Sequence, residues 1–229
     1  MLYSEQDVKA NIRNRDGKRV FFLGKGDQLT SGARDYLSRE RIEIRPGDQA
    51  KIQRYRLLSG GFLEEKPEQM THLSGDILVP KDHPRIRFRG KMDTLQAELL
   101  LCGPEEAGVE EILALSRRII RCEVMEEPLE GGRLLGLTEE ELHKRSHFPQ
   151  DYYGQPHFMP EIADGALMAR LNRARCAARE AELAAVRAFR DREGNPTRPD
   201  ILMALNRMSS ALYLLMIQRK SRAGSRPAP

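Results

Sequence analysis

The chain has 229 residues, of which 40% are hydrophobic and 31% are charged, and its formal net charge is +4 at pH 7. This length suits one large domain, or one domain with a small appendage, and the composition is typical of a soluble globular protein with a hydrophobic core. Lysine and arginine alternate with aspartate and glutamate along the sequence, so no basic face or run indicates a nucleic-acid-binding protein.

The cysteines and the lengths of the apolar runs indicate the cellular compartment of the protein. Cys102, Cys122 and Cys176 are too far apart for a zinc ribbon, and an odd, low count without a signal peptide is typical of a reducing cytosol. The apolar stretch after Leu212 ends at Ile217, and no apolar run approaches the ~18 residues of a membrane span. We therefore expect a cytoplasmic protein without a membrane segment.

Residues 1–69 are expected to form a small N-terminal α+β appendage. A short strand is predicted at Arg19–Gly24, and a short helix followed by a strand is predicted within Ser31–Ile44. The pairs Pro46-Gly47 and Gly60-Gly61 then mark a turn-rich connection to the rest of the chain.

From about residue 70 to residue 218 the pattern is helical. Five helices are predicted, at Phe88–Leu101, Gly108–Met125, Leu137–His147, Ala166–Asp191 and Pro199–Ile217. Gly103-Pro104 must end the first helix, and Thr138 forms a capping box with Glu141 for the short third one. Four substantial helices and a shorter one, joined by modest loops, favour a mainly α fold, an antiparallel helical bundle. Residues 219–229 are expected to be a disordered tail.

The last predicted helix is apolar enough to be buried on all sides, yet it carries polar groups in its middle. Asn206, Ser209, Ser210 and Tyr213 lie within two helical turns of one another. The long helix before it has a polar stripe on one face, because residues three or four positions apart share a face. The members of that stripe are Asn172, Arg175, Arg179 and Glu182.

Arginines on an alanine-rich helix usually lie in solvent and pair with glutamate, and this interpretation is favoured for Arg170, Arg173 and Arg187. Arg175 differs because its small neighbours allow another helix to come close. A buried arginine needs a carboxylate partner or an anion. Asp93, on the first helix of the bundle, is a candidate partner on spacing alone.

The approach to the first helix combines hydroxyl, glycine and basic residues, which suit phosphate oxygens near a helix start. These residues are Thr71, His72, Ser74, Gly75 and Lys81, followed by Arg85, Arg87 and Arg89. The segment Gly24–Gly32 has a similar composition, and no Walker-type phosphate-binding motif is present. Both segments are candidates for an anion-binding loop.

Four segments in consistent order together resemble the cobalamin adenosyltransferases, most closely the branch encoded with ethanolamine utilisation. They are THLSGD with PKDHPRIRFRGKMDTL, GLTEEELHKRSH, FMPEIADGALMARLNRARCAAREAE and ALNRMSSALY. The resemblance covers residues 71–217, with weaker similarity in LTSGARDYLSRERIEI, and each motif alone is weak. Ser210 replaces the family's aspartate in the last motif, which leaves the role of that position open.

The resemblance implies a helical bundle that transfers the 5′-deoxyadenosyl group of ATP to the cobalt of cob(I)alamin, making adenosylcobalamin. Asp93 and Arg175 match a buried ion pair that shapes the active site, and these two are the expected catalytic residues. The residues expected to bind ATP with Mg²⁺ are Thr71, His72, Ser74, Gly75, Lys81, Arg89, Arg175, Arg179, Glu182 and Asn206. Gly24–Gly32 becomes the weaker phosphate-binding candidate, because it lies far upstream.

The wider family places an aromatic residue three positions before a proline, where it blocks the lower face of cobalt. In this chain that position, counted back from Pro160, is His157, beside Phe158 and Met159. We expect these three residues to face the corrinoid substrate, with Phe158 at the lower face. Coordination of cobalt by His157 is the less favoured interpretation.

Some relatives in the ethanolamine branch bind a divalent metal through a histidine and a CC-x-x-C cluster. The corresponding region, residues 54–69, contains no cysteine, and His72 and His83 are isolated, so no structural Zn²⁺ or Fe²⁺ site is expected. Related enzymes self-associate with active sites between subunits, which implies a homo-oligomer, either a trimer or a dimer. A flavoprotein reductase is a candidate partner.

Two other interpretations stay open. A non-catalytic corrinoid-binding bundle, or a cargo or scaffold protein of a bacterial microcompartment, would need neither Arg175 nor Asn206. A helical nucleic-acid-binding or regulatory module would need a basic face and aromatic platforms, which the sequence lacks. The separateness of residues 1–69 makes them a candidate segment for docking in a microcompartment, the second candidate location beside the cytoplasm.

Overall fold

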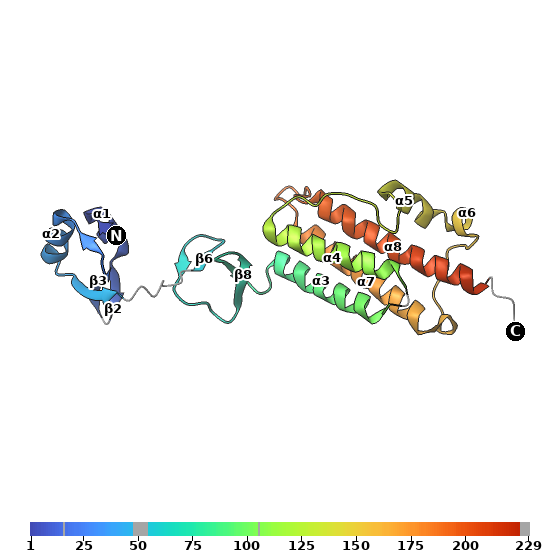
Figure 1. Cartoon of the computed structure of the whole chain (residues 1–229), viewed down its shortest axis with the longest axis horizontal. Coiled ribbons are helices and arrows are strands. Elements are labelled where there is room, and N and C mark those ends of the chain that lie inside the picture. Colours follow the sequence, from blue (N-terminus) through green and yellow to red (C-terminus); the bar gives the residue numbers. More distant parts are fainter. Residues whose placement is uncertain (16, 48–54, 105, 225–229) are drawn as a thin grey trace. The chain divides into compact units, whose positions relative to one another are not determined.

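The computed structural model describes residues 1–15, 17–47, 55–104 and 106–224 (Figure 1). Contacts between residues divide the chain into two compact units, Met1–Arg54 and Tyr55–Pro229. We expected an appendage that reached residue 69, whereas this division places residues 55–69 in the second unit. The reason is that this segment contributes two strands to a sheet of the second unit.

The first unit combines short strands with two short helices around a small core. Strand β3 (Lys18–Gly24) pairs in antiparallel fashion with β2 (Arg13–Arg15) and in parallel with β5 (Glu43–Gly47). The remaining elements are β1 (Leu2–Tyr3), α1 (Glu5–Asn11), β4 (Gln28–Leu29) and α2 (Ser31–Arg39). Phe21 and Leu37 are buried between the sheet and the helices. The strand and helix predicted from the sequence are therefore β3 and α2.

The second unit begins with a four-stranded sheet in the order β7-β6-β9-β8. Its strands are β6 (Tyr55–Leu57), β7 (Phe62–Leu63), β8 (Met70–Ser74) and β9 (Ile77–Pro80). Strands β8 and β9 form an antiparallel hairpin that turns at Gly75, whose φ of +52° is a conformation that favours glycine. The residues expected in a phosphate-binding loop thus lie on a β8–β9 hairpin.

Helices make up most of the second unit, and this confirms the mainly α fold. The long helices are α3 (Pro84–Leu101), α4 (Gly108–Met125), α7 (Gly165–Ala188) and α8 (Pro199–Gly224), and the short ones are α5 (Glu139–His147), α6 (Pro149–Tyr153) and the 3-10 helix η1 (Ile162–Asp164). Helix α8 extends into the expected tail, because Lys220 pairs with Asp164 and Ser221 donates to the carbonyl of Tyr153. Residues 219–224 are helical, and residues 225–229 lie outside the described part.

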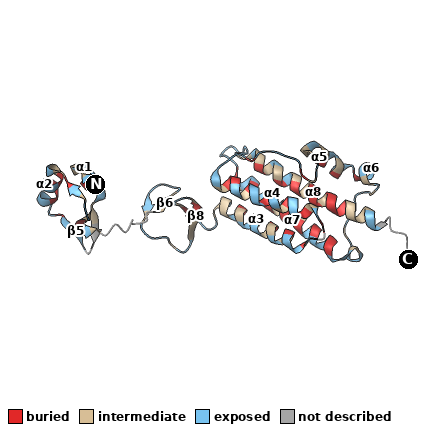
Figure 2. Cartoon of the chain, viewed as in Figure 1, coloured by how far each residue is buried: buried red, intermediate tan, exposed pale blue. Residues whose placement is uncertain are grey.

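Helix α7 packs on both α3 and α8, because alanines along it allow close approach (Figure 1). Its fully buried alanines are Ala174, Ala177, Ala178, Ala181 and Ala185. On the α3 side, Arg173 pairs with Glu98, and Lys91 pairs with Glu180. Figure 2 shows buried residues along all four long helices. This packing fixes the face that α7 presents to α8.

Helix α8 is more apolar than we expected from the sequence. Residues Pro199–Ala223 are long and apolar enough to cross a membrane by length and composition alone, although no such run was expected. Half of its most apolar window is buried inside the structure, where Met208 and Leu212 are fully enclosed. Such burial is typical of a core helix, and α8 contacts α4, α5, α6 and α7.

Candidate functional site

A polar seam lies where α7 and α8 face each other, and we call it the α7–α8 seam. The residues in contact across it are Arg175 and Glu182 on α7 and Asn206 and Tyr213 on α8, and helical spacing puts Asn172, Arg179, Ser209 and Ser210 on the same faces. Among the described residues, two polar contacts join the helices there. Asn206 Nδ2 donates to Glu182 Oε1 at 3.1 Å, and the guanidinium carbon of Arg175 lies 5.9 Å from the centre of the Tyr213 ring. The two polar stripes predicted from the sequence therefore meet.

Arg175 has partners other than the carboxylate we expected. Its Nε and Nη2 donate to Asn172 Oδ1 at 3.2 and 3.1 Å, and the residue is half-buried. Asp93 is exposed on α3, and among the described residues it forms no ion pair with Arg175. The helical repeat explains the difference: Met92 and Leu95 face the core, so Asp93 between them points elsewhere. The predicted ion pair is absent within this single chain.

The middle of the seam opens to solvent. Asn206 and Arg179 are both exposed, although α8 as a whole is a core helix. Among the described residues, Arg179 has no ion-pair partner. Glu182 is half-buried and holds the Asn206 amide through its carboxylate. Arg179 lies one helical turn from Glu182 on α7. An exposed guanidinium so near a carboxylate that orients an amide can bind an anionic ligand with polar edges.

The segment expected to face the corrinoid joins the seam at Tyr213. His157 Nδ1 lies 2.9 Å from the Tyr213 hydroxyl, and the Phe158 ring stacks on the Tyr213 ring with centres 6.2 Å apart. Phe158 is half-buried, whereas Met159 is 85% exposed. The structure therefore brings His157 and Phe158 to the end of the seam near Arg175. Met159 lies beside them without such a contact.

Five other expected ATP-binding residues lie on the β8–β9 hairpin or directly after it, apart from the seam, and Arg89 lies on α3. Thr71 and Ser74 are half-buried on β8, and His72 Nδ1 lies 3.0 Å from the carbonyl oxygen of Gly75. Lys81 Nζ donates to Glu68 Oε1 at 2.7 Å, and both side chains are exposed. Within the described ranges, no contact joins these residues to the seam. A single chain thus holds the two halves of the expected site separately.

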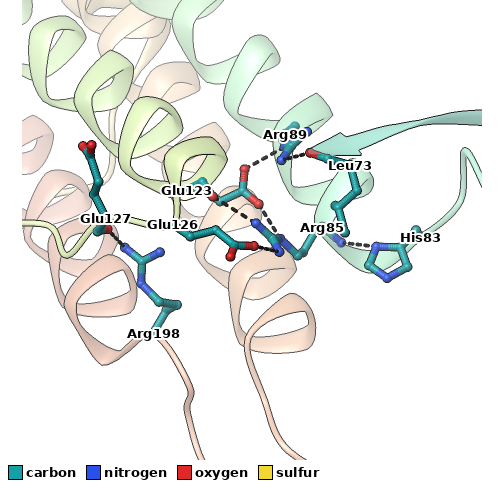
Figure 3. A network of polar contacts seen from close by, with 8 residues as sticks. All are labelled: Leu73, His83, Arg85, Arg89, Glu123, Glu126, Glu127 and Arg198. Atoms are coloured by element: carbon teal, nitrogen blue, oxygen red, sulfur yellow. Dashed lines mark hydrogen bonds and ion pairs between the residues drawn. The ribbon is translucent and has the colours of Figure 1, made fainter. Parts of the chain in front are cut away.

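A second charged cluster binds the hairpin to the helices, and we call it the Glu123 network. Figure 3 shows Arg85 and Arg89 of α3 directed toward Glu123 of α4. Arg85 Nε donates to Glu123 Oε1 at 2.5 Å and Arg89 Nε donates to Glu123 Oε2 at 2.6 Å. Arg89 Nη2 also donates to the carbonyl of Leu73 on β8 at 2.8 Å, and Arg85 Nη1 reaches Glu126 at 3.1 Å. These bonds tie α3, α4 and the hairpin together.

The charged groups of the Glu123 network are largely buried and are paired with one another. Glu123 is completely buried, and the side chains of Arg85 and Arg89 are each 19% exposed. Burial, with the nearby guanidiniums of Arg85 and Arg89, lowers the pKa of His83, whose neutral Nδ1 accepts the backbone N–H of Arg85 and caps α3. Arg89, expected to bind ATP, already has both sides of its guanidinium occupied by protein groups.

Sequence reasoning missed Glu123, and it gave Tyr213 no role. The sequence did indicate that Glu123 is buried. It lies four residues after the buried Ile119, so it occupies the same face of α4 as the apolar stripe. A glutamate in that position needs a cationic partner. Tyr213 shares a face of α8 with polar residues but has a longer side chain. Its hydroxyl therefore contacts His157, which is far away in the sequence.

Metal-binding groups do not cluster in the described part of the chain. No three or more histidine, cysteine, aspartate or glutamate side chains lie close enough there to hold an ion. Cys102 and Cys122 are buried as free thiols, and burial raises the pKa of Cys102 to about 11. The expectation that this chain has no structural metal stays a prediction.

Comparison with known proteins gives one family. The profile described as "Cobalamin adenosyltransferase" matches residues 62–219. The protein named "Corrinoid adenosyltransferase EutT" of Salmonella typhimurium is 38% identical over 158 residues, which cover 67% of this chain and 59% of the relative. The protein of the same name from Escherichia coli K12 is 37% identical over the same lengths. The chain thus spans about 59% of the length of these relatives.

Proposed function

The chain belongs to the cobalamin adenosyltransferase family, and from this membership we propose that it transfers the 5′-deoxyadenosyl group of ATP to cob(I)alamin, within ethanolamine utilisation. One observation carries the proposal. Tyr213 contacts both Arg175, a residue matched to nucleotide binding, and the His157–Phe158 segment, matched to the corrinoid. The two substrates of such a transfer must meet, and these two sets of residues do lie together.

The residue types suit this chemistry. Cob(II)alamin first loses its lower axial ligand, and one-electron reduction then gives cob(I), which attacks the ribose 5′ carbon and expels a polyphosphate. Arg175 and Arg179 supply positive charge for the ATP phosphates and the leaving group, and Asn206, held by Glu182, binds a polar edge of the nucleotide. Phe158 gives the apolar surface that the lower face of the corrin needs. No protein nucleophile or general base is required.

The proposed assembly is a homo-oligomer, a trimer or dimer of antiparallel helical bundles, with each active site between subunits. The ion pairs Arg173–Glu98 and Lys91–Glu180 support opposite directions of α3 and α7, since higher numbers on one helix pair with lower numbers on the other. Among the residues that the structure describes, the β8–β9 hairpin does not contact the seam of its own chain. We propose that it meets the seam of a neighbouring subunit, where Lys81, Thr71 and Ser74 bind the triphosphate with Mg²⁺.

The cellular setting follows from the same proposal. A reductant must deliver an electron to cob(II)alamin, and a flavoprotein reductase is the proposed partner. The proposed location is the cytoplasm, with a bacterial microcompartment as the site of ethanolamine utilisation. The first unit, Met1–Arg54, lies outside the matched region and is the proposed docking segment. Its deletion should release the protein from the microcompartment and leave the transfer reaction intact.

An anaerobic assay tests the proposed activity. Purified protein is mixed with Mg-ATP, cobalamin and a strong reductant, and the visible spectrum is followed for adenosylcobalamin. Asn206→Ala and Arg175→Ala should each lower the rate about 100-fold, as loss of a preorganised donor does. Arg173→Ala is the matched control, because Arg173 pairs with Glu98 and Glu180 on the α3 side and should leave the rate unchanged. A folded protein that binds corrinoid without forming product would replace the enzyme with a corrinoid-binding or cargo protein.

A further inference from the structure

The Tyr213 hydroxyl is the centre of a short hydrogen-bond chain. His157 Nε2 lies 3.1 Å from the backbone carbonyl of His147, and His157 Nδ1 lies 2.9 Å from the Tyr213 hydroxyl. A carbonyl can only accept, so Nε2 carries the hydrogen and Nδ1 of the neutral imidazole accepts from the Tyr213 O–H. The backbone N–H of Phe158 donates to the same hydroxyl oxygen at 3.4 Å. One hydroxyl therefore fixes both a side chain and the backbone of the 157–158 segment.

The ring of Tyr213 makes a second set of contacts. The His157 ring is nearly parallel to it, with an interplanar angle of 6° and centres 5.7 Å apart, and the Phe158 ring is inclined by 23°. The guanidinium of Arg175 lies above the same ring. The helix backbone that carries the ring is fixed, because its neighbours Leu212 and Leu214 on α8 are fully buried. A rigid helix thus presents Tyr213 to both sides of the site.

We propose that Tyr213 is a positioning residue for the transfer reaction, which rests on the proposed function above. Through its ring it contacts Arg175 on the nucleotide side, and through its hydroxyl it orients Phe158 on the corrinoid side. The hydroxyl sets the angle and depth of Phe158 at the lower face of the corrin, where an apolar ring must displace the axial ligand of cob(II)alamin. His157 serves this alignment, since both of its ring nitrogens are bonded to protein groups and neither is free for cobalt.

The test is Tyr213→Phe, which keeps the ring and its stacking and removes only the hydroxyl. Tyr153→Phe is the matched control, because among the described residues the buried Tyr153 hydroxyl has no hydrogen-bond partner. For Tyr213→Phe, kcat/KM for cob(II)alamin should fall about tenfold, the effect of losing one or two hydrogen bonds. The KM for ATP should change less than about twofold. Tyr153→Phe should match the wild type in both constants.

A spectroscopic measurement separates positioning from a general loss of structure. With ATP bound, the wild type should convert cob(II)alamin to the form without a lower axial ligand, which the visible spectrum reports. Tyr213→Phe should give several-fold less of that form at saturating cob(II)alamin. His157→Ala removes the same bond from an exposed side chain, so it should act in the same direction, and Tyr213→Phe with His157→Ala should be less than additive.

The outcomes are distinct for the two proposals. If the wild type forms no adenosylcobalamin under reducing anaerobic conditions, the proposed function fails. If the wild type is active and Tyr213→Phe keeps the wild-type corrinoid kinetics and spectrum, the positioning role of Tyr213 is overturned. Equal losses for ATP and corrinoid would also overturn it, because they would show a general effect on the fold.

Discussion

The Glu123 network and the α7–α8 seam use the same residue types in opposite ways. Both contain two arginines and at least one glutamate. In the network the arginines of α3 face the glutamates of α4, whereas in the seam both arginines and Glu182 lie on α7. In the network, Glu123 is fully buried and bonds both arginines, and Arg89 also bonds the carbonyl of Leu73. In the seam, Arg179 is exposed and has no ion-pair partner among the described residues. The network is complete without a ligand, whereas the seam is not.

The difference shows that charged side chains can either stabilise the fold or bind a ligand, depending on their burial. A buried carboxylate between two guanidiniums satisfies its own hydrogen bonds and resists change, because removal of one partner leaves an uncompensated buried charge. An exposed guanidinium stays hydrated and exchanges water for a ligand at little cost. We therefore expect changes in the network to alter stability, and changes in the seam to alter substrate binding.

The largest expected effect is on stability and comes from Glu123→Gln. Glutamine keeps the shape of the side chain, but Arg85 and Arg89 lose their shared counter-charge in a buried setting, so the free energy of unfolding should fall by about 3 kcal/mol. Urea denaturation at fixed protein concentration measures the change. Glu126→Gln is the control: Glu126 bonds the same Arg85 but is 65% exposed, and its loss should be less than about 1 kcal/mol. Equal losses for the two variants would show that burial of Glu123 adds nothing to the stability that its ion pairs give.

In the seam, Arg179→Ala should weaken ATP binding and leave the stability of the fold nearly unchanged. The KM for ATP should rise about tenfold, because one charge-assisted hydrogen bond to the nucleotide is lost, while the free energy of unfolding should change by less than about 0.5 kcal/mol. Arg173→Ala is a matched control on the same helix: Arg173 is also exposed, but it pairs with Glu98 and Glu180. Steady-state kinetics and urea denaturation on both variants give the comparison. A stability loss without a KM change would assign Arg179 to the fold.

The seam could be predicted from the sequence because helical spacing decides it. Residues three and four positions apart share a face, so Arg175, Arg179 and Glu182 were placed together correctly by number alone. The partner of each group could not be predicted in this way. The contact between Glu182 and Asn206 depends on how α7 lies against α8. The Asp93–Arg175 pair does not form among the described residues of the single chain, because Asp93 points away from the core side of α3.

The hairpin and the network were missed for physical reasons of another kind. Strands β8 and β9 have five and four residues, too few for an alternating pattern to stand out against a loop. Glu123 lay within a regular apolar stripe, and a stripe of that kind predicts only a buried face. Its two arginines come from α3, 34 and 38 positions away in the sequence, so the network needs a tertiary contact to be seen.

The ion pair of Arg198 and Asp200 is intermediate in burial between the Glu123 network and the exposed Arg179. Its side chains are 20% and 24% exposed. Asp200 Oδ2 accepts from Arg198 Nη2 and from the backbone N–H of Leu129, each at 2.8 Å, which ties the start of α8 to the segment after α4. Figure 3 shows the same Arg198 donating to the carbonyl of Glu127. Burial alone would raise the pKa of Asp200, but these hydrogen bonds outweigh it and lower the pKa to about 2 from 3.8.

The smallest predicted effect is therefore a pH dependence of stability. Because the folded-state pKa of Asp200 lies below the unfolded value, its contribution is fully present above about pH 4 and is lost as the pH falls toward 2. Asp200→Asn should cost about 1 kcal/mol at pH 6, after allowance for solvent screening, and the difference from wild type should shrink below pH 4. Asp76→Asn, which removes an exposed pair with Arg56, should show no measurable difference at either pH. Urea denaturation from pH 6 to pH 3 measures both variants, and a constant gap for Asp200→Asn would mean that its hydrogen-bond geometry, not its charge, stabilises the start of α8.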